Sequence, residues 1–442
     1  MQKFFTPRSI AVIGVSSNPD KVGHVIYSHV LKKFKSYAVN NKRKKILGKK
    51  TYLSVLDIKD NIDLGIIAVP AKFVLETVEQ CGKKGIKHLI IVTSGFKEIG
   101  NERLEHELHK ILDKYKIKCI GPNCLGSFDA HSGLDTLFLP TKKLTRPKPG
   151  SISFISQSGA VGSTILDKIS YEHVGFAKFI SYGNAVNLDE TDYLEFLGKD
   201  KQTKVICIYL EGIKDGRKFL NIARKIKKPI ILIKAGRSET GQKATMSHTG
   251  SLAGSYVVHK GAFKQGNVIM VESIRDMFNV ARLFDKLPAV KNKNVQVITN
   301  GGGFGIITAD ALESHGINLA KLSSITKTNL KEKLSELVTI SNPIDLVGDV
   351  TNERYALAVN ACMKDKNVGV LAIVVLTQTP LIDKKIVNVI KKHKGKKPII
   401  ILSLGGEQTK KVAREFEKSG FPVFEYPEDA ASALQKYLEF YF

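Results

Sequence analysis

The stretch "GSISFISQSGAVGSTILDKISY", residues 150–171, decides the fold of this chain. A run rich in isoleucine, phenylalanine and serine ends in a serine–glycine turn, and a helical pattern follows directly. The same order of features occurs twice more, as "SIAVIGVSSNPDKVGHVIYSHVLKKF" at 9–34 and "NVQVITNGGGFGIITADALESHG" at 294–316. Each unit predicts a strand, a tight turn and a helix. Repetition of such units predicts parallel sheets covered by helices.

The chain of 442 residues is too long for one ordinary domain. The repeated pattern breaks twice, first in "DAHSGLDTLFLPTKKLTRPKPG" and later in "FDKLPAVKNKN", which contain proline and lysine but little periodicity. We therefore predict an α/β protein of three consecutive Rossmann/flavodoxin-like parallel-sheet domains with two linkers. The predicted domains are 1–128, 150–285 and 293–442, and the linkers are 129–149 and 286–292.

Composition limits the possible classes of protein. Apolar residues make up 43% of the chain, which is enough for buried cores, and no run of about twenty apolar residues predicts a membrane-spanning helix. The apolar run near the N-terminus enters a glycine turn and lacks a cleavage site, which favours a strand over a signal peptide. Five cysteines without metal or disulfide spacing favour reduced, buried thiols. We expect a cytoplasmic protein that has no metal site of its own.

The formal net charge of +26 raises the possibility of nucleic-acid binding. The basic residues are mostly lysines spread along the chain, and the one dense cluster is "NNKRKKILGKK" at 40–50. No tryptophan is present, and aromatic residues that could stack on bases are missing from the cluster. The pattern favours a solvated lysine surface that attracts small polyanions. Nucleic-acid binding remains a rival interpretation that rests on charge alone.

The turn after the first predicted strand is typical of a phosphate-binding site at a helix N-terminus. It extends from Gly14 to Gly23 and lacks the spacing of a dinucleotide fingerprint. The position that would hold an acidic ribose ligand is Asn40, followed closely by Lys42. Lysines there suit a ligand with more phosphate than NAD. A purely structural turn without ligand stays open as the alternative.

Two further segments are predicted to emerge at the same sheet edge, "AVPAKFV" at 68–74 and "VTSGFKE" at 92–98. They offer small, apolar and backbone-donor surface of the kind that an adenine ring and a pantetheine arm need. A third segment, "CIGPNCLG" at 119–126, closes the domain.

Several motifs in order resemble the NDP-forming acyl-CoA synthetases, the superfamily of succinyl-CoA synthetase and the ADP-forming acetate–CoA ligases. The first domain is similar to their coenzyme A domain in "IAVIGVSSNPDKVG", "VPAKF", "SGFKE" and "GPNCLG". The second continues the match with "ISQSGAVG", "YGNAVNLDETDYLEFL", "IYLEGIKDGRKF" and "KAGRSETGQKATMSHTGSLAG". The third resembles the extra domain of the acetate-type ligases in "TNGGGFGIITADAL" and "SNPIDLVGD".

The resemblance implies that His248 carries a phosphoryl group. It lies in "KATMSHTGSLAG", 243–254, where glycines and hydroxyl residues predict a loop that moves. A neutral imidazole is a good nucleophile, and the family takes phosphoryl from an acyl phosphate onto this histidine. Glu211 corresponds to the family's histidine-orienting glutamate. Taken alone, a histidine in such a loop is usually a surface residue, and Glu211 could simply open a turn.

The remaining site residues are predicted around these two. The turn that enters the second-domain helix offers backbone N–H groups and hydroxyls to a phosphate, and its members are Ser156, Gln157, Ser158, Gly159 and Ala160. The predicted coenzyme A contacts are Gly14, Ser16, Ser17, Lys21, Gly23, Asn40, Lys42, Val69, Pro70, Ser94, Gly95, Phe96 and Asn123.

No P-loop and no ATP-grasp pattern occur in the sequence, so the resemblance implies an α subunit that works with an ATP-grasp β subunit. The β subunit would hold ADP or ATP with Mg²⁺, in an expected α2β2 assembly. The implied reaction converts acyl-CoA, ADP and phosphate to a small carboxylic acid, CoA and ATP. A CoA-binding regulatory protein without catalysis is the alternative.

The sequence departs from the family pattern at three places. Asn41 stands where the family often has proline, residues 184–189 vary, and Gly303-Phe304 lacks a nearby proline. None of these removes a catalytic group, but the second could alter the acyl pocket. The glycines at 301–305 lack an acidic ribose partner and a phosphate-binding lysine, which favours packing against the partner subunit over nucleotide binding.

Overall fold

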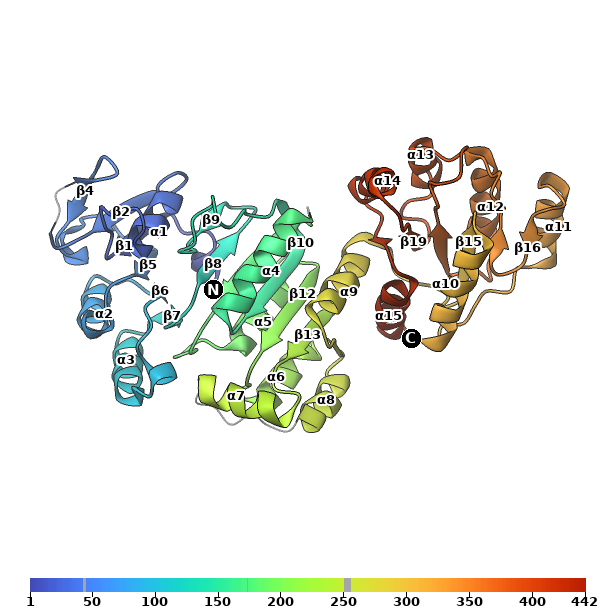
Figure 1. Ribbon diagram of the computed structural model, residues 1–442. Coiled ribbons are helices and arrows are strands. Elements are labelled where there is room, and N and C mark those ends of the chain that lie inside the picture. The colour runs from blue at the N-terminus through green and yellow to red at the C-terminus, as the bar shows by residue number, and fades with distance from the viewer. Residues whose placement is uncertain (43–44, 173, 250–255) are drawn as a thin grey trace. The chain divides into compact units, whose positions relative to one another are not determined.

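The computed structural model describes residues 1–42, 45–172, 174–249 and 256–442, without the side chains of 246–249. Contacts divide the chain into two compact units, Met1–Ile274 and Arg275–Phe442. The described residues form three mostly parallel sheets, two in the first unit and one in the second, with helices packed on the sheets (Figure 1). The predicted α/β fold class is confirmed.

The first sheet has the strand order β3-β4-β2-β1-β5-β6-β7, and only β3 and β4 pair antiparallel. Its strands are β1 (Ser9–Ile13), β2 (Lys35–Val39), β3 (Lys45–Ile46), β4 (Lys49–Tyr52), β5 (Leu64–Ile67), β6 (His88–Ile91) and β7 (Lys118–Ile120). The helices of this part are α1 (Val22–Val30), α2 (Val74–Lys83) and α3 (Glu102–Lys114), with 3-10 turns η1 (Gln2–Phe4), η2 (Val55–Asp57), η3 (Ala71–Phe73) and η4 (Lys97–Ile99).

The second sheet has the order β14-β13-β12-β10-β11-β8-β9. Its strands are β8 (Gly126–Asp129), β9 (Leu134–Asp135), β10 (Pro149–Ser156), β11 (Phe176–Ser181), β12 (Val205–Leu210), β13 (Ile230–Lys234) and β14 (Val268–Met270). The helices are α4 (Gly159–Tyr171), α5 (Glu190–Lys199), α6 (Gly216–Ala223), α7 (Glu239–Thr249) and α8 (Tyr256–Gln265). The sheet thus begins before residue 150, because the short strand β8 pairs antiparallel with β11 and β9 pairs antiparallel with β8. The predicted linker 129–149 therefore contains β9, a strand of two residues that is too short to show periodicity in the sequence.

The third sheet has the order β16-β17-β15-β18-β19-β20. Its strands are β15 (Val295–Thr299), β16 (Thr339–Ile340), β17 (Ile344–Asp345), β18 (Val370–Val374), β19 (Ile399–Leu402) and β20 (Val423–Phe424). The helices are α9 (Ile274–Lys286), α10 (Gly302–Ser314), α11 (Ser324–Lys333), α12 (Asn352–Lys364), α13 (Lys385–Lys391), α14 (Glu407–Lys418) and α15 (Pro427–Glu439). Nearly all of α9 falls in the second unit, since Phe284 packs on Tyr437 with ring centroids 5.0 Å apart.

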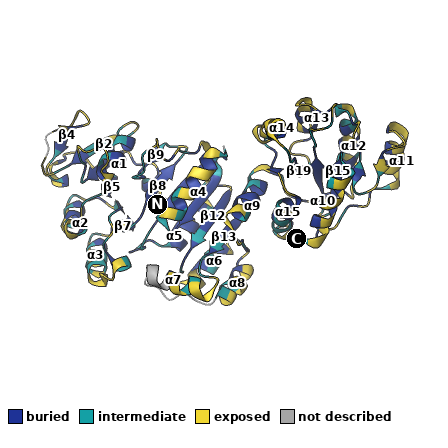
Figure 2. Cartoon of the chain, viewed as in Figure 1, coloured by how far each residue is buried: buried dark blue, intermediate teal, exposed yellow. Residues whose placement is uncertain are grey.

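The central strands of the sheets are buried on both faces, whereas the short strands β3, β4 and β16 are partly exposed. The helices have buried and exposed sides (Figure 2). Helix α3, for example, buries Leu108 and Leu112 and carries charged residues elsewhere. One hydrophobic cluster contains residues of both sheets of the first unit. Phe5 stacks on Phe196 with centroids 5.0 Å apart, so the N-terminal segment packs on α5. The hydrophobic effect therefore holds these two sheets together as one unit.

Candidate functional site

The first turn brings two backbone segments into direct contact. Gly14 has a φ of +96°, and a Cβ on Gly23 would lie 2.2 Å from the Gly14 carbonyl oxygen. Only glycine fits at either position. The Asn40 side chain donates to the Val15 carbonyl, which fixes the turn from the neighbouring strand. Helix α1 begins at Val22 without a side-chain cap, so its first N–H groups suit an anion.

Other predicted coenzyme A contacts follow neighbouring parallel strands at the same edge. Val69 and Pro70 follow β5, and Ser94 follows β6, while Asn123 follows β7. The Thr93 hydroxyl donates to the Val69 carbonyl at 2.7 Å, and the backbone N–H of Asn123 donates to the Thr93 carbonyl at 2.9 Å. These bonds tie the three strand ends together.

Phe96 differs from the other predicted contacts. Its side chain is fully buried in the hydrophobic core, so its ring cannot contribute to the sheet edge as the sequence analysis expected. Burial of a phenylalanine ring is favourable because it removes apolar surface from water. Only the Phe96 backbone lies at the edge, where its N–H donates to the Glu98 carboxylate.

The predicted phosphate site is a strand-to-helix turn, as its sequence indicates. Ser156 ends β10, and its hydroxyl donates to the Ser158 carbonyl at 2.6 Å. Ser158 is the N-cap of α4 and accepts from the Val161 N–H. Gly159 and Ala160 form the first turn of that helix. The turn therefore presents helix N-terminal donors at the carboxyl edge of the second sheet.

Gln157 joins this turn to the predicted catalytic glutamate. Its Oε1 accepts from the N–H of Glu211 at 2.8 Å and from the N–H of Gly212 at 3.0 Å. The contact arises because β10 and β12 are neighbours in the sheet. Glu211 is buried, with 6% of its surface exposed. Burial, followed by the charge of Glu211, raises the pKa of nearby Tyr209 to about 12.

Lys234 is a residue of this edge that the sequence analysis missed. It ends β13, is 2% exposed, and donates from Nζ to the carbonyl oxygens of Glu211 and Ala235, both at 2.8 Å. Burial lowers the pKa of its ammonium, and the negative charge of Glu211 opposes that change. A lysine at the end of an apolar strand is the signal that could have found it, since lysines are seldom buried without a partner.

The backbone of His248 lies in the last turn of α7, and its side chain lies outside the described residues. The predicted loop 243–254 is therefore wrong for residues 243–249, which are helical, while 250–255 lie outside the described residues. The helix forms because the Ser238 hydroxyl accepts from the Gly241 N–H and Glu239 stands in the first turn. These start signals outweigh the glycine and hydroxyl content of the segment.

The loop after β11 joins the predicted coenzyme A edge to the predicted phosphate turn. The Tyr182 N–H donates to the Ser156 carbonyl at 3.1 Å, and the Asn184 N–H donates to the Pro122 carbonyl at 3.0 Å. A Cβ on Gly183 would lie 2.2 Å from the Asn123 carbonyl oxygen. The two edges are therefore continuous through residues 182–184.

The third sheet repeats the strand–glycine–helix pattern with a different outcome. Asn300 follows β15, and its side chain bonds to the Leu376 carbonyl, to the Thr379 hydroxyl and to the Tyr355 hydroxyl. Its polar atoms are thus used within the fold.

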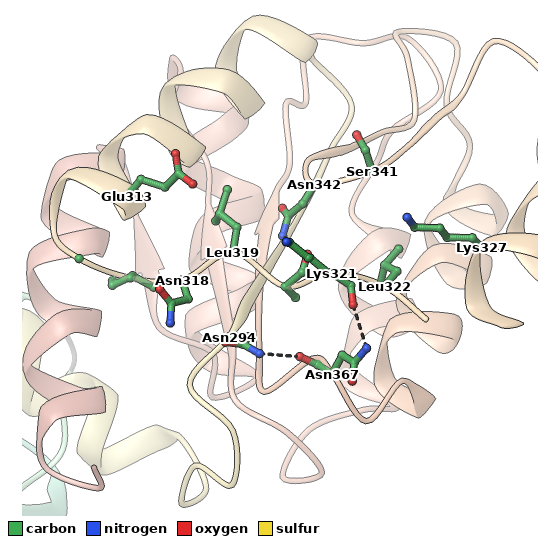
Figure 3. A pocket seen from close by; sticks show the side chains of 13 residues that line it. Asn294, Glu313, Asn318, Leu319, Lys321, Leu322, Lys327, Ser341, Asn342 and Asn367 are labelled. Atoms are coloured by element: carbon green, nitrogen blue, oxygen red, sulfur yellow. Dashed lines mark hydrogen bonds between the residues drawn. The ribbon is translucent and has the colours of Figure 1, made fainter. Parts of the chain in front are cut away.

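A groove of about 910 Å³ lies in the same unit at the opposite, amino edge of the third sheet (Figure 3). Asn294 and Asn367, which line it, precede β15 and β18. Ligands of open α/β sheets bind at the carboxyl edge instead, so the groove is not the candidate site.

Within the described ranges, no group of three acidic, histidine or cysteine side chains has the arrangement of a metal site. The same residues include no helix long and apolar enough to cross a membrane. All five cysteines are buried, and burial raises the pKa values of Cys81, Cys124 and Cys362 to about 12. These thiols are therefore unsuited to nucleophilic chemistry near pH 7.

Comparison with known proteins decides the family. Residues 8–128 match the family described as a CoA binding domain, and residues 149–284 match the succinyl-CoA ligase like flavodoxin domain. The chain is 40% identical over 443 residues to the α subunit of ADP-forming acetate–CoA ligase II of Pyrococcus furiosus, covering 97% of this chain and 95% of that protein. The chain belongs to the ADP-forming acetate–CoA ligase family.

Other relatives of this ligase family agree. The ADP-forming acetate–CoA ligase I of Archaeoglobus fulgidus is 40% identical over 442 residues, and the match covers 98% of this chain and 63% of that longer protein. Among solved structures, the dinucleotide forming acetyl-coenzyme A synthetase 1 of Ca. Korarchaeum cryptofilum, in complex with phosphate and ADP, has a TM-score of 0.93 and 35% identity. That match covers 99% of this chain and 96% of the other. The catalytic interpretation is thus supported over a CoA-binding regulatory protein.

Proposed function

We propose that the chain catalyses the acyl and phosphoryl transfer steps of an ADP-forming acyl-CoA synthetase at the joined carboxyl edges of its first two sheets. The observation that carries the proposal is the hydrogen bond that the Glu211 N–H donates to Gln157 Oε1. The continuity of the two edges through residues 182–184 supports it. A cofactor bound along the first edge would thereby end beside a phosphate-binding turn.

Phosphate is proposed to bind at the N-terminus of α4, where Ser158 caps the helix. A phosphate oxygen attacks the thioester carbonyl of acyl-CoA, the C–S bond breaks, and CoA leaves as the thiolate. The product is an acyl phosphate. An imidazole nitrogen of His248 then attacks phosphorus, the bond between phosphorus and the acyl oxygen breaks, and the carboxylate leaves.

The role proposed for Glu211 is to orient the imidazole and to stabilise its positive charge as the phosphorus–nitrogen bond forms. The burial of Glu211 supports this role, since a carboxylate interacts more strongly with a cation away from water. Lys234 is proposed to fix the backbone on which Glu211 stands, because its ammonium donates to the Glu211 carbonyl.

The phosphoryl group must next reach a nucleotide. Relatives named subunit alpha imply a partner subunit, and we propose an ATP-grasp β subunit that holds ADP and Mg²⁺ in an α2β2 assembly. The substrate class is a small carboxylic acid. The coenzyme A contacts predicted from the sequence, with Phe96 through its backbone only, belong to the same proposal. The predicted domain boundaries and a cytoplasmic location belong to it as well.

The test is ATP formation from acetyl-CoA, ADP and phosphate by this chain with a co-expressed β subunit. Glu211→Gln should lower kcat by about 10³-fold, because the imidazolium loses its carboxylate. Glu195→Gln, on an exposed face of α5, is the matched control and should retain activity. A wild-type complex that binds CoA but forms no ATP would favour the regulatory alternative.

A further inference from the structure

One side-chain amide stands between two carboxylates at the joined edges. The Asn184 Nδ2 donates to Glu98 Oε2 at 2.7 Å and to Glu105 Oε2 at 2.8 Å. Its Oδ1 accepts from the Asn123 Nδ2 at 3.3 Å. We call these four residues the Asn184 bridge. It connects the loop after β11 with η4, α3 and the loop after β7.

The orientation of the Asn184 amide follows from its partners. Turning the amide over would place Oδ1 against two carboxylate oxygens, which is repulsive. The backbone supports the same orientation, because the Asn184 N–H is bonded to the Pro122 carbonyl and Ala185 holds a φ of +58°. The amide is therefore fixed before it meets Glu98 and Glu105.

Glu98 links the Asn184 bridge to the backbone of the neighbouring turn. Its carboxylate also accepts from the N–H groups of Gly95 and Phe96, so it fixes the turn that precedes η4. Burial raises the pKa of Glu98, but hydrogen bonds from Asn184 and from backbone amides outweigh burial and hold the pKa below its usual value. Glu98 is thus an anion near pH 7, and it needs the donors that surround it.

The turn η4 is also in contact with α7, whose last turn includes the backbone of His248. The position of η4 therefore limits the position of α7 beside the coenzyme A edge. We propose that Asn184 is a positioning residue, which holds η4 as the docking surface for α7 while His248 accepts phosphoryl. This inference rests on the proposed function, since it assigns a role to the docked state of α7.

The structure offers a charge-exchange test. Asn184→Asp would place a third carboxylate within hydrogen-bond distance of Glu98 and Glu105, in place of the donor. Glu98→Gln in the same chain would restore a donor, because the new amide nitrogen at position 98 could face the new carboxylate at position 184. The new amide oxygen would still accept from the Gly95 N–H. Glu105 is half-buried on α3, where its Oε2 also accepts from the Lys97 N–H at 3.4 Å and water screens its charge. Asn221→Asp on the exposed face of α6 adds the same charge elsewhere and is the control.

The experiment uses the complex with the β subunit, without ADP, and follows phosphohistidine formation from acetyl-CoA and labelled phosphate in single turnovers. Asn184→Asp should slow the rate by about 10²-fold, because a displaced histidine loses its line of attack. At saturating acetyl-CoA, the final amplitude should stay at the wild-type value. The Asn184→Asp/Glu98→Gln chain should recover most of the rate, and Asn221→Asp should lose none.

The final amplitude separates positioning from unfolding, because unfolded protein lowers the amplitude and leaves the rate of the remainder unchanged. A wild-type rate in Asn184→Asp, no recovery in the double variant, or a loss of rate explained wholly by weaker CoA binding would overturn the inference. Absence of phosphohistidine in the wild type would instead contradict the proposed function itself.

Discussion

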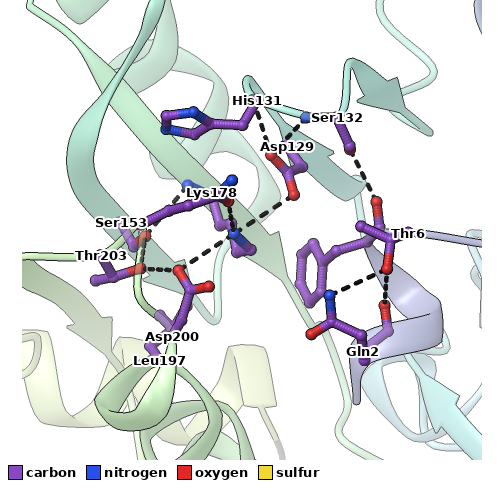
Figure 4. A network of polar contacts seen from close by, with 12 residues as sticks. Gln2, Thr6, Asp129, His131, Ser132, Ser153, Lys178, Leu197, Asp200 and Thr203 are labelled. Carbon is purple, nitrogen blue, oxygen red and sulfur yellow. Dashed lines mark hydrogen bonds and ion pairs between the residues drawn. The ribbon is translucent and has the colours of Figure 1, made fainter.

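Two buried lysines of the second sheet have the same exposure, 2%, and different surroundings. Lys178 lies inside β11, and its Nζ is 3.4 Å from Asp129 Oδ2 and 3.2 Å from Asp200 Oδ2 (Figure 4). The same Nζ donates to the side-chain oxygen of Gln202. Lys234, at the end of β13, donates to two backbone carbonyls beside Glu211. The first ammonium has fixed anionic partners, whereas the second has neutral ones and a single carboxylate nearby.

The two lysines stand at opposite edges of the second sheet, which explains why their partners differ. The partners of Lys178 include Asp200, which precedes β12, so this network holds the amino edge of the sheet. Lys234 stands at the carboxyl edge, where ligands of α/β sheets bind. A lysine whose charge is balanced by bound carboxylates stabilises the fold. A lysine bonded to neutral carbonyls keeps a positive potential that can stabilise a reacting anion. A substitution at Lys178 should therefore mainly lower stability, and a substitution at Lys234 should mainly lower activity.

The largest effect is expected at the amino edge. Lys178→Met should destabilise the unit Met1–Ile274 by about 3–5 kcal/mol in urea unfolding, because two buried carboxylates lose their shared cation. A second substitution, Asp129→Asn, should recover part of the loss. An unfolding midpoint of Lys178→Met at the same urea concentration as the wild type would contradict the stabilising role of Lys178.

The next effect concerns the carboxyl edge. Lys234→Met should lower the rate of phosphohistidine formation by about 10²-fold, because Glu211 loses the backbone anchor that positions it. Its effect on stability should be smaller, about 1–2 kcal/mol, since only hydrogen bonds to carbonyls are lost. Stopped-time labelling and urea unfolding of the same preparation measure both quantities. A stability loss equal to that of Lys178→Met, at full activity, would reverse the assignment.

A smaller effect is expected at the phosphate turn. Gln157→Glu keeps the acceptor for the Glu211 N–H but adds a negative charge beside the proposed phosphate site. The KM for phosphate should rise by about tenfold, because like charges repel, while the KM for acetyl-CoA stays unchanged. Steady-state kinetics with each substrate varied in turn would decide. Equal changes in both KM values would argue against a phosphate site at this turn.

The smallest effect is a pH dependence of stability. The pKa of Lys234 is lowered in the folded chain, so folding carries a cost for burying the ammonium at pH values below that folded pKa. As the pH rises from the folded pKa towards 10.5, the unfolded chain holds more protons, and the cost disappears. The stability of the wild type should therefore rise relative to Lys234→Met over this alkaline range. If the free energy of unfolding changed with pH in the same way for both proteins, the result would contradict the lowered pKa of Lys234.

The sequence predicted the strand–turn–helix units well, because their periodicity and turn residues are local signals. It could not predict that Gln157 bonds to the Glu211 backbone, since that contact depends on β10 and β12 being neighbours in space. Lys178 and Lys234 were overlooked because the composition favoured solvated lysines, although both stand in apolar strands. The sequence did not predict the helix at 243–249, because glycine and hydroxyl residues in 243–254 favour a loop. The helix start signal, the Ser238 hydroxyl that accepts from the Gly241 N–H, lies before this segment.

The sequence also could not predict the Asn184 bridge. Its members are brought together by the packing of the first two sheets. Asn123 was a predicted site residue, but nothing in the sequence pairs it with Asn184 or places Asn184 between two carboxylates. Residues 184–189 vary from the family pattern, and the sequence alone relates this variation to the acyl pocket. The position of Asn184 between two carboxylates links this loop instead to the η4 turn.

The most direct measurement for the whole account is the site of phosphorylation. The complex, incubated with acetyl-CoA and labelled phosphate without ADP, should carry an acid-labile, base-stable label that maps to His248. The label should be absent in His248→Ala and present in His259→Ala, a control in the neighbouring helix α8. Addition of ADP should discharge it as ATP. Label that persists in His248→Ala would contradict the account.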